Sequence, residues 1–262
     1  HLSLRRQRQM CIRDRLRTMK DFTQDHEIRV QSCGSRGASL YLTGPVSYDD
    51  QLSSYFMEPP TFSTAIRLRL GLEVRPLPSR CEGCSGSHAT DTEGHASLKC
   101  MRCGHRTKAH NALRDALAGI CRDALLSPKL EPHVFASHPN LRADLAFFRS
   151  GQLHVIDVAI THPFRDDTTR KIAAAMPGGA ANCYEQIKNA HYRDALTKMH
   201  VLVPFVCDSY GALCETAILL LQAIVPLYAR RLGISSTVAS RIIFGRITSS
   251  VVKSMASIGT SL

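Results

Sequence analysis

The chain has 262 residues, 44% of them hydrophobic, and its 33 Lys and Arg outnumber 22 Asp and Glu to give a net charge of +11. This length allows one sizeable core with a small additional unit. The positive charge favours a polyanionic partner such as nucleic acid, with a merely basic surface as the alternative. No membrane partner is expected, because the longest apolar stretch, Ala217–Ala229, is too short to span a bilayer and contains Gln222 and Pro226.

The first 80 residues are expected to carry no catalytic residue. Residues 1–15 include the run RQRQMCIRDR, which resembles a translated sequencing adapter, so we expect them to be a non-native leader. Residues 16–80 are expected to form a linker region of loops and short helices. Within this region, the apolar spacing of Phe62–Leu72 predicts a helix that ends at Gly71. The side chains expected to face inward are Ala65, Ile66 and Leu70.

Residues 81–110 carry a pattern that predicts a zinc knuckle. Cys81 and Cys84 are separated by two residues, which lets two thiolates reach one ion from a tight turn, and His95 and Cys100 would complete a tetrahedron. A four-cysteine site, in which Cys103 replaces His95, is the alternative. Further candidate ligands are His88, His105 and His110. Coordination by protein side chains alone indicates a structural Zn²⁺, and cysteines clustered beside histidines favour a metal in a reducing compartment over disulfides.

The next segment combines a helix with a short strand. Residues 111–126 repeat apolar side chains at helical spacing, and Asn111 is the expected N-cap. The expected apolar stripe consists of Leu113, Leu117, Ile120 and Ala124. Lys129–Phe135 is predicted to be a strand that contains Glu131. Glu131 is a candidate auxiliary catalytic acid, with an ordinary surface glutamate as the alternative interpretation.

The stretch Leu141–Ile160 predicts a β-hairpin around the two-residue turn Ser150-Gly151. Pairing outward from this turn places Asp144 opposite Asp157, with Cβ atoms roughly 5 Å apart on one face. Both strands are apolar on both faces, which predicts a central, buried sheet. Two carboxylates that face each other there repel and are poorly solvated, so a divalent cation is expected between them. A shared proton or an Arg or Lys partner is the alternative.

The C-terminal part is expected to supply helices and one further strand. Thr161–Gly179 is predicted to be a polar loop that could act as a flap, and the helix over 180–198 carries Glu185, Lys188 and Tyr192 at spacings that place them on one face. His200–Cys207 is predicted to be an apolar strand. Residues 216–262 are expected to form a basic helical tail that contacts phosphates, with a solvated helical face as the alternative. The basic residues of this tail include Arg230, Arg231, Arg241, Arg246 and Lys253.

The order of helix, strand, hairpin, helix and strand predicts an α/β fold built on a small mixed sheet flanked by helices. Two opposed acids on the central hairpin and a lysine from the next helix are the groups needed for metal-assisted hydrolysis of a phosphodiester. Asp144 and Asp157 would hold Mg²⁺ (or Mn²⁺), which polarises the phosphate and helps to ionise a water. Lys188 would orient that water or neutralise charge that develops on the phosphate.

These motifs, in this order, resemble the C-terminal part of reverse transcriptases from non-LTR retrotransposons that carry a restriction-like endonuclease. The matching stretches are Cys81, Cys84, His95 and Cys100, then HNALRDALA at 110–118, RADL at 142–145, IDVAI at 156–160 and YEQIKNAHY at 184–192. The resemblance implies a CCHC zinc knuckle followed by a PD-(D/E)XK nuclease core over residues 111–215. It implies Asp144 and Asp157 as metal-binding acids, and it places Lys188 and Tyr192 on the helix that carries the catalytic lysine.

The same resemblance implies a nuclease that nicks genomic DNA, whose free 3′ end then primes reverse transcription. DNA and element RNA are therefore the expected partners, in the nucleus. The rest of a reverse transcriptase polyprotein is expected to be missing, because no polymerase motif such as YxDD occurs. Two positions depart from the pattern of the superfamily. Ala143 replaces its proline and Ala159 replaces its lysine, so Lys188 would inherit the role of the lysine.

Two other functions compete with this hypothesis. One is a catalytically inactive zinc-knuckle remnant that binds nucleic acid, and the other is a structural zinc scaffold that contacts proteins. The intact set of Asp144, Asp157 and Lys188 favours the active nuclease. Neither the target sequence nor the oligomeric state follows from the sequence.

Overall fold

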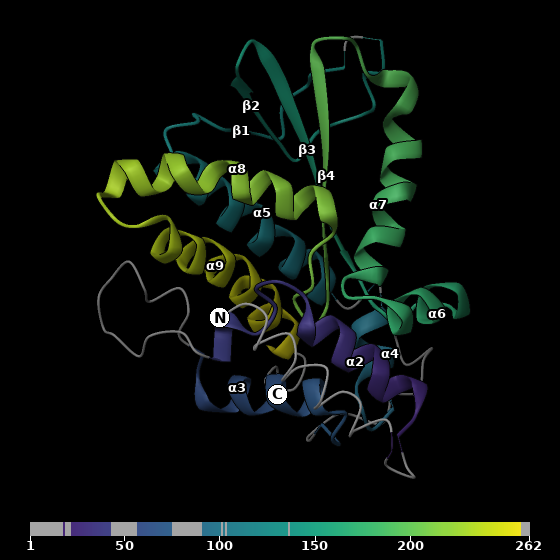
Figure 1. The fold of residues 1–262 in the computed structure, drawn as a ribbon. Helices are drawn as coiled ribbons and strands as arrows, with labels where there is room; N and C mark the ends of the chain where they lie inside the picture. Colours follow the sequence, from purple (N-terminus) through teal and green to yellow (C-terminus); the bar gives the residue numbers. More distant parts are fainter. Residues whose placement is uncertain are drawn as a thin grey trace.

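The computed structural model describes residues 22–42, 57–74, 91–100, 104–135 and 137–257, together with residues 18 and 102. Its centre is a four-stranded sheet with the strand order β1-β2-β3-β4 (Figure 1). The strands are β1 (Lys129–Leu130), β2 (Leu145–Arg149), β3 (Gln152–Thr161) and β4 (His200–Asp208). The first three strands are antiparallel, and β4 runs parallel to β3. The predicted α/β fold with a small mixed sheet is therefore confirmed.

Helices cover both faces of this sheet. On one face, the main core joins sheet residues such as Leu145 and Ile156 to helices α5 (His105–Asp123), α8 (Glu215–Leu232) and α9 (Ser236–Ala256). On the other face, the end of α7 (Gly179–Tyr192) and the short helix η4 (Arg193–Ala195) pack over Val155. Helix α6 (Asp167–Ala175) packs against α7. Together α6 and α7 form the crossover that the parallel pair β3–β4 requires.

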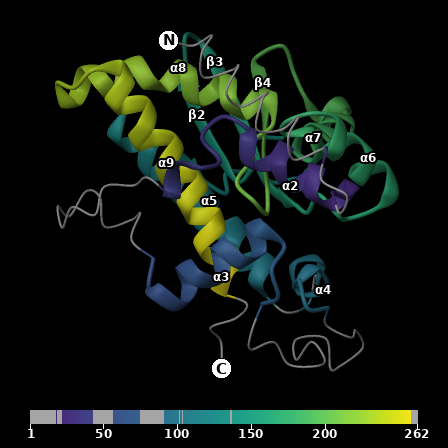
Figure 2. The same ribbon diagram turned by 60° about the horizontal axis from the view of Figure 1, so that its bottom comes forward.

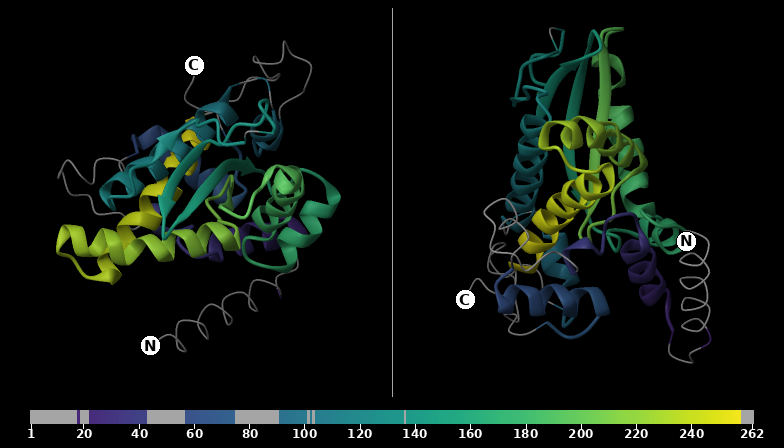
Figure 3. Two further views of the ribbon diagram at one scale, coloured as in Figure 1. Left: turned by 90° about the horizontal axis from the view of Figure 1, so that it is seen from above. Right: turned by 60° about the vertical axis from the view of Figure 1, so that its left-hand side comes forward.

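The N-terminal elements lie at the end of the molecule opposite the β2–β3 turn (Figures 2 and 3). Helix α2 (Gln24–Gly34) packs against α6, while α3 (Pro59–Leu70) and the short helix η1 (Leu40–Leu42) pack against α9. The five-residue helix α4 (His95–Lys99) follows. These elements add no strand, so the residues expected to carry chemistry remain on the sheet and its adjoining helices.

The central hairpin has the predicted turn and register. Ser150 and Gly151 both have positive φ, +50° and +77°, which is typical of a two-residue type I′ turn. Pairing runs from Arg149–Gln152 to Leu145–Ile156. The expectation that both faces are buried is correct for the base of the hairpin but wrong at its tip, where Phe148 is 69% exposed. The covering helices do not extend over this end of the strands.

Several element boundaries differ from the predicted ones. Helix α5 begins at His105 after Gly104, which has a φ of +73°, so Asn111 lies inside the helix and does not cap it. The strand expected over Lys129–Phe135 is limited to β1, because Glu131 has a φ of +46° and turns the chain away. The predicted loop Thr161–Gly179 contains α6, whose first turn is capped by the Asp166 carboxylate accepting from the Thr169 N–H at 2.7 Å.

The two remaining helical predictions are also modified. Helix α3 ends at Gly71 as expected, but its buried residues are Thr64, Ala65 and Leu68, while Leu70 is exposed. The region expected to be a basic tail forms α8 and α9, which contribute to the same core as the sheet. Within the described ranges no single helix is long and apolar enough to cross a membrane, and α8 and α9 meet that criterion only as a pair bent by 117°.

Candidate active site

Asp157 lies in the middle of β3 and is almost completely buried, with 5% of the residue exposed. Its Oδ1 accepts a hydrogen bond from the Tyr192 hydroxyl at 2.7 Å, and its Oδ2 lies 2.7 Å from Lys188 Nζ. Lys188 and Tyr192 are four residues apart on α7, so successive turns of one helix present both side chains to the same carboxylate. The lysine expected to reach the acids from the next helix is therefore placed beside one of them.

Asp144 stands directly before β2, next to the last pair of the β2–β3 ladder. Its backbone N–H donates to the Ile156 carbonyl at 3.0 Å, and its Oδ2 accepts from the Val158 N–H at 2.7 Å. These bonds hold the Asp144 side chain against the residues that flank Asp157 in β3. The side chain remains 20% exposed, so the buried Asp157 is adjoined by a carboxylate that solvent can reach.

His110 joins this site although the sequence indicated it only as a spare zinc ligand. Its Nε2 lies 3.3 Å from Asp144 Oδ2. The hydrogen bond with Asp144 raises the pKa of His110, and the charge of Asp157 raises it further. Partial burial opposes this rise. The extension of α5 to His105 brings His110 onto the helix that packs under the sheet. Helical spacing continued backward from Leu113 to Ala109 was the signal for that extension.

The hydroxyl of Tyr192 acts as a donor at this site. Burial and the charge of Asp157 raise the pKa of Tyr192, so its phenol keeps its proton at neutral pH. The same hydroxyl lies 3.2 Å from the Arg142 carbonyl, and the ring packs with Phe135. Tyr192 therefore fixes the orientation of the Asp157 carboxylate and is unsuited to accepting a proton.

Two glutamates that were expected near this chemistry have other partners. Glu131 is about half exposed, and its carboxylate pairs with Arg114 Nη1 at 2.6 Å and Arg142 Nη1 at 3.6 Å. Glu185 is buried and accepts a hydrogen bond from Thr216 at the start of α8. The expectation that Glu185 projects together with Lys188 and Tyr192 is therefore wrong, because it faces α8 while they face Asp157.

The two carboxylates have a chemistry that suits a hard divalent cation. Asp157 Oδ2 is buried and accepts no well-directed hydrogen bond from the described residues, although the Lys188 ammonium is 2.7 Å away. A cation bound there would share this oxygen with the Lys188 ammonium. The described residues contain no group of three or more His, Cys, Asp and Glu suited to a metal, so Mg²⁺ held by Asp144 and Asp157 would complete its coordination with water or phosphate oxygens.

The predicted zinc knuckle lies mostly outside the described residues, which exclude Cys81, Cys84, His88, Cys103 and the side chain of His105. His95 and Cys100 lie at the two ends of α4. The Nδ1 of His95 is 3.1 Å from His162 Nε2, and its Nε2 is 3.2 Å from Glu93 Oε2 and 3.0 Å from Arg29 Nη2. Zn²⁺ at Nε2 would have to replace these last two contacts, so the zinc site stays a prediction.

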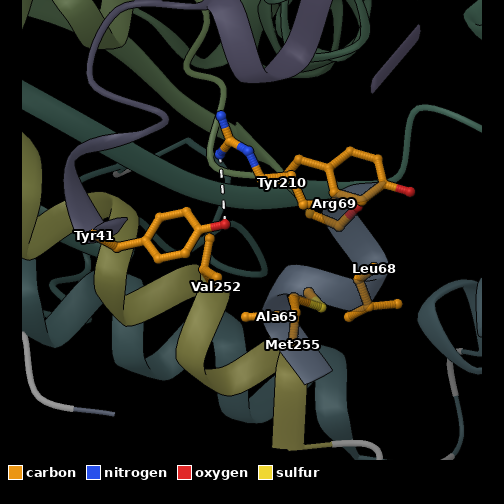
Figure 4. Close-up of a pocket in the computed structure, with 8 residues that line it drawn as sticks. Tyr41, Ala65, Leu68, Arg69, Tyr210, Val252 and Met255 are labelled. Atoms are coloured by element: carbon orange, nitrogen blue, oxygen red, sulfur yellow. Dashed lines mark hydrogen bonds between the residues drawn. The ribbon is translucent and has the colours of Figure 1, made fainter. Parts of the chain in front are cut away.

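A small pocket between α3 and α9 is not a candidate for substrate. Figure 4 shows that Tyr41, Arg69 and Val252 surround it, with Arg69 Nη1 3.4 Å from the Tyr41 hydroxyl. Its volume of about 10 Å³ holds at most one water molecule. The candidate active site is therefore taken from the side-chain contacts of Asp157, Lys188, Tyr192 and Asp144. No family model matches the chain, and no curated protein matches it significantly.

Proposed function

We propose that this chain is a metal-dependent DNA endonuclease that nicks its target by phosphodiester hydrolysis, as a module of a retrotransposon-type reverse transcriptase. One observation carries the proposal: a single buried carboxylate, Asp157, is held by Lys188 and Tyr192 from one helix and lies next to a second carboxylate, Asp144, whose side chain is 20% exposed. Two acids with a lysine at hydrogen-bond range are the groups that this reaction uses. The mixed sheet with helices on both faces is compatible with a restriction-like core.

Each side chain has a role that follows from its contacts. Asp144 and Asp157 would hold Mg²⁺ or Mn²⁺, and the bound ion would polarise the phosphate and lower the pKa of a water. Lys188 is placed to orient that water or to neutralise charge on the phosphate. Tyr192 keeps one oxygen of Asp157 fixed, and His110 does the same for Asp144. Fixed carboxylates hold the reacting groups in place without reorganisation during the reaction.

The test is the nicking of supercoiled plasmid in Mg²⁺ or Mn²⁺ by the full chain and by Asp157→Asn. We expect metal-dependent nicking that the variant loses. The matched control is Asp123→Asn, because Asp123 is also ion-paired, with Arg246 Nη1 at 2.6 Å, but lies at the end of α5. A folded protein that binds plasmid without nicking it in either metal would contradict the proposal. That result would favour the inactive nucleic-acid-binding remnant.

A further inference from the structure

The ring of Tyr184 on α7 contacts two cations beside the candidate active site. Lys188 Nζ lies 5.9 Å from the centre of this ring, and the guanidinium carbon of Arg165 lies 5.2 Å from the same centre. Both distances are typical of a cation–π interaction. Because the two cations share one ring, their charges lie within about 11 Å of each other. Arg165, from the segment between β3 and α6, is therefore a neighbour of the lysine that meets Asp157.

Two further contacts fix the orientation of Arg165 and leave part of its guanidinium free. Its Nε donates to Asp166 Oδ2 at 2.7 Å, and its Nη2 donates to Thr169 Oγ1 at 3.2 Å. The Thr169 N–H and the Arg165 guanidinium lower the pKa of Asp166 to about 2, so Asp166 stays charged and keeps Arg165 in place. A guanidinium has five N–H donors. Nη1 makes no hydrogen bond within the described part of the chain, so it can donate to a ligand.

Arg165 lies close enough to Lys188 for both side chains to contact one DNA strand. Both are partly exposed, with 22% of the Lys188 side chain and 31% of the Arg165 side chain accessible to solvent. One DNA strand carries a phosphate about every 3.4 Å along the helix axis. A strand with one phosphate at Lys188 therefore has others within the distance to Arg165. The planar guanidinium also matches the geometry of phosphate oxygens.

We propose that Arg165 donates from Nη1 to a phosphate of the target strand close to the phosphate that is hydrolysed. This inference rests on the proposed function, because it takes Lys188 as the cation at the hydrolysed phosphate. Arg165 is then a substrate-binding residue, and Tyr184 and Asp166 are the residues that position it. A contact of this kind fixes the position of the strand over the carboxylates and carries no sequence preference of its own.

The test is the salt dependence of binding to a short fluorescent duplex, measured by anisotropy without added Mg²⁺ or Mn²⁺ so that no cleavage occurs. For Arg165→Gln, the slope of log affinity against log salt concentration should become shallower by about 0.9, the value for one phosphate contact. Arg165→Lys keeps the charge and should keep the slope. Arg170→Gln is the matched control, because Arg170 also lies over a ring, that of Phe164, and is ion-paired, with Asp25. It should leave the slope unchanged.

The outcomes separate this inference from the proposed function. An unchanged slope in a folded Arg165→Gln would overturn the role of Arg165, whatever the nicking assay shows. An equal change in Arg170→Gln would also overturn it, because a general loss of positive charge would then explain both results. A shallower slope for Arg165→Gln alone, in a protein that does not nick plasmid, would support the phosphate contact while contradicting the hydrolytic function. Absence of duplex binding by the unchanged protein would overturn the inference.

Discussion

Asp157 and Asp208 are two buried aspartates on neighbouring strands, and they have very different partners. Asp157 in β3 meets the Lys188 ammonium and the Tyr192 hydroxyl, each at 2.7 Å. Asp208, fully buried at the end of β4, is held by neutral donors: the Ser32 hydroxyl at 2.7 Å and the N–H groups of Tyr210 and Ala212, each at 2.9 Å. No Lys or Arg among the described residues forms an ion pair with Asp208.

The difference separates a structural carboxylate from one suited to chemistry. Burial raises the pKa of Asp208 to about 6, even though its hydrogen bonds oppose the change. Its donors come from the turn after β4 and from α2, so Asp208 links two parts of the fold. Asp157 instead has a cationic partner that is itself 22% exposed, on the face where solvent reaches Asp144. Because the protein stabilises the charge of Asp157 beside groups that are partly exposed, this carboxylate is the better candidate for a functional role.

Removing the cation from Asp157 should produce the largest effect. We expect Lys188→Met to lower the nicking rate by about 10²- to 10³-fold, because a donor aimed at charge that develops in the transition state is lost. Plasmid affinity should change little, since one lysine contributes a small part of the phosphate contacts. Nicking rates and plasmid binding, measured on the same preparation, check both expectations.

Lys171→Met is the control for this variant, because Lys171 is an exposed lysine on the neighbouring helix α6. It should leave the nicking rate unchanged. Lys188→Met with full nicking activity would show that the lysine assignment is wrong. The Lys188→Met variant leaves Asp157 buried without its cation, which destabilises the fold. Thermal unfolding of the variant therefore shows whether any loss of activity comes from unfolding.

Asp208→Asn should change stability rather than nicking. A carboxyl whose folded pKa is about 6, above the ordinary value of 3.8, binds its proton more tightly in the folded state. Its contribution to stability is therefore present at low pH and is lost as the pH rises from about 4 to 6. Across the whole titration the stability of Asp208→Asn relative to the unchanged protein should rise by about 3 kcal/mol, at 1.36 kcal/mol per pKa unit, and about 2 kcal/mol of this rise should fall between pH 4.5 and pH 7.5.

Urea unfolding of both proteins at pH 4.5 and pH 7.5 measures this difference. The comparison between the two proteins removes the effect of other groups that titrate in the same range, including His95 and His162, whose pKa values burial lowers. A stability difference that stays constant with pH would show that Asp208 is not the group responsible.

The two aspartates also show which parts of the site could be predicted from the sequence. The hairpin register and the shared face of Lys188 and Tyr192 are local patterns, set by a two-residue turn and by helical spacing, whereas Tyr192 meets Asp157 across 35 positions. Asp208 meets Ser32 across 176 positions, and His110 meets Asp144 across 34. Such contacts depend on how elements pack, and no periodicity in the chain predicts them. The predicted strand position of Glu131 is wrong for a local reason, since its positive φ of +46° ends β1 early.

Glu131 supplies a third carboxylate for the comparison and the smallest expected effect. It is 49% exposed and pairs with Arg114 and Arg142 at the surface, where an ion pair contributes about 0–1 kcal/mol. Glu131→Gln keeps the shape and one hydrogen-bond acceptor, so unfolding stability should change by less than about 1 kcal/mol. Because no contact ties its carboxylate to Asp157 or Lys188 among the described residues, the nicking rate should stay close to that of the unchanged protein. A rate that falls as far as that of Lys188→Met would mean that Glu131 leaves its arginines when DNA binds, and would return it to the catalytic set.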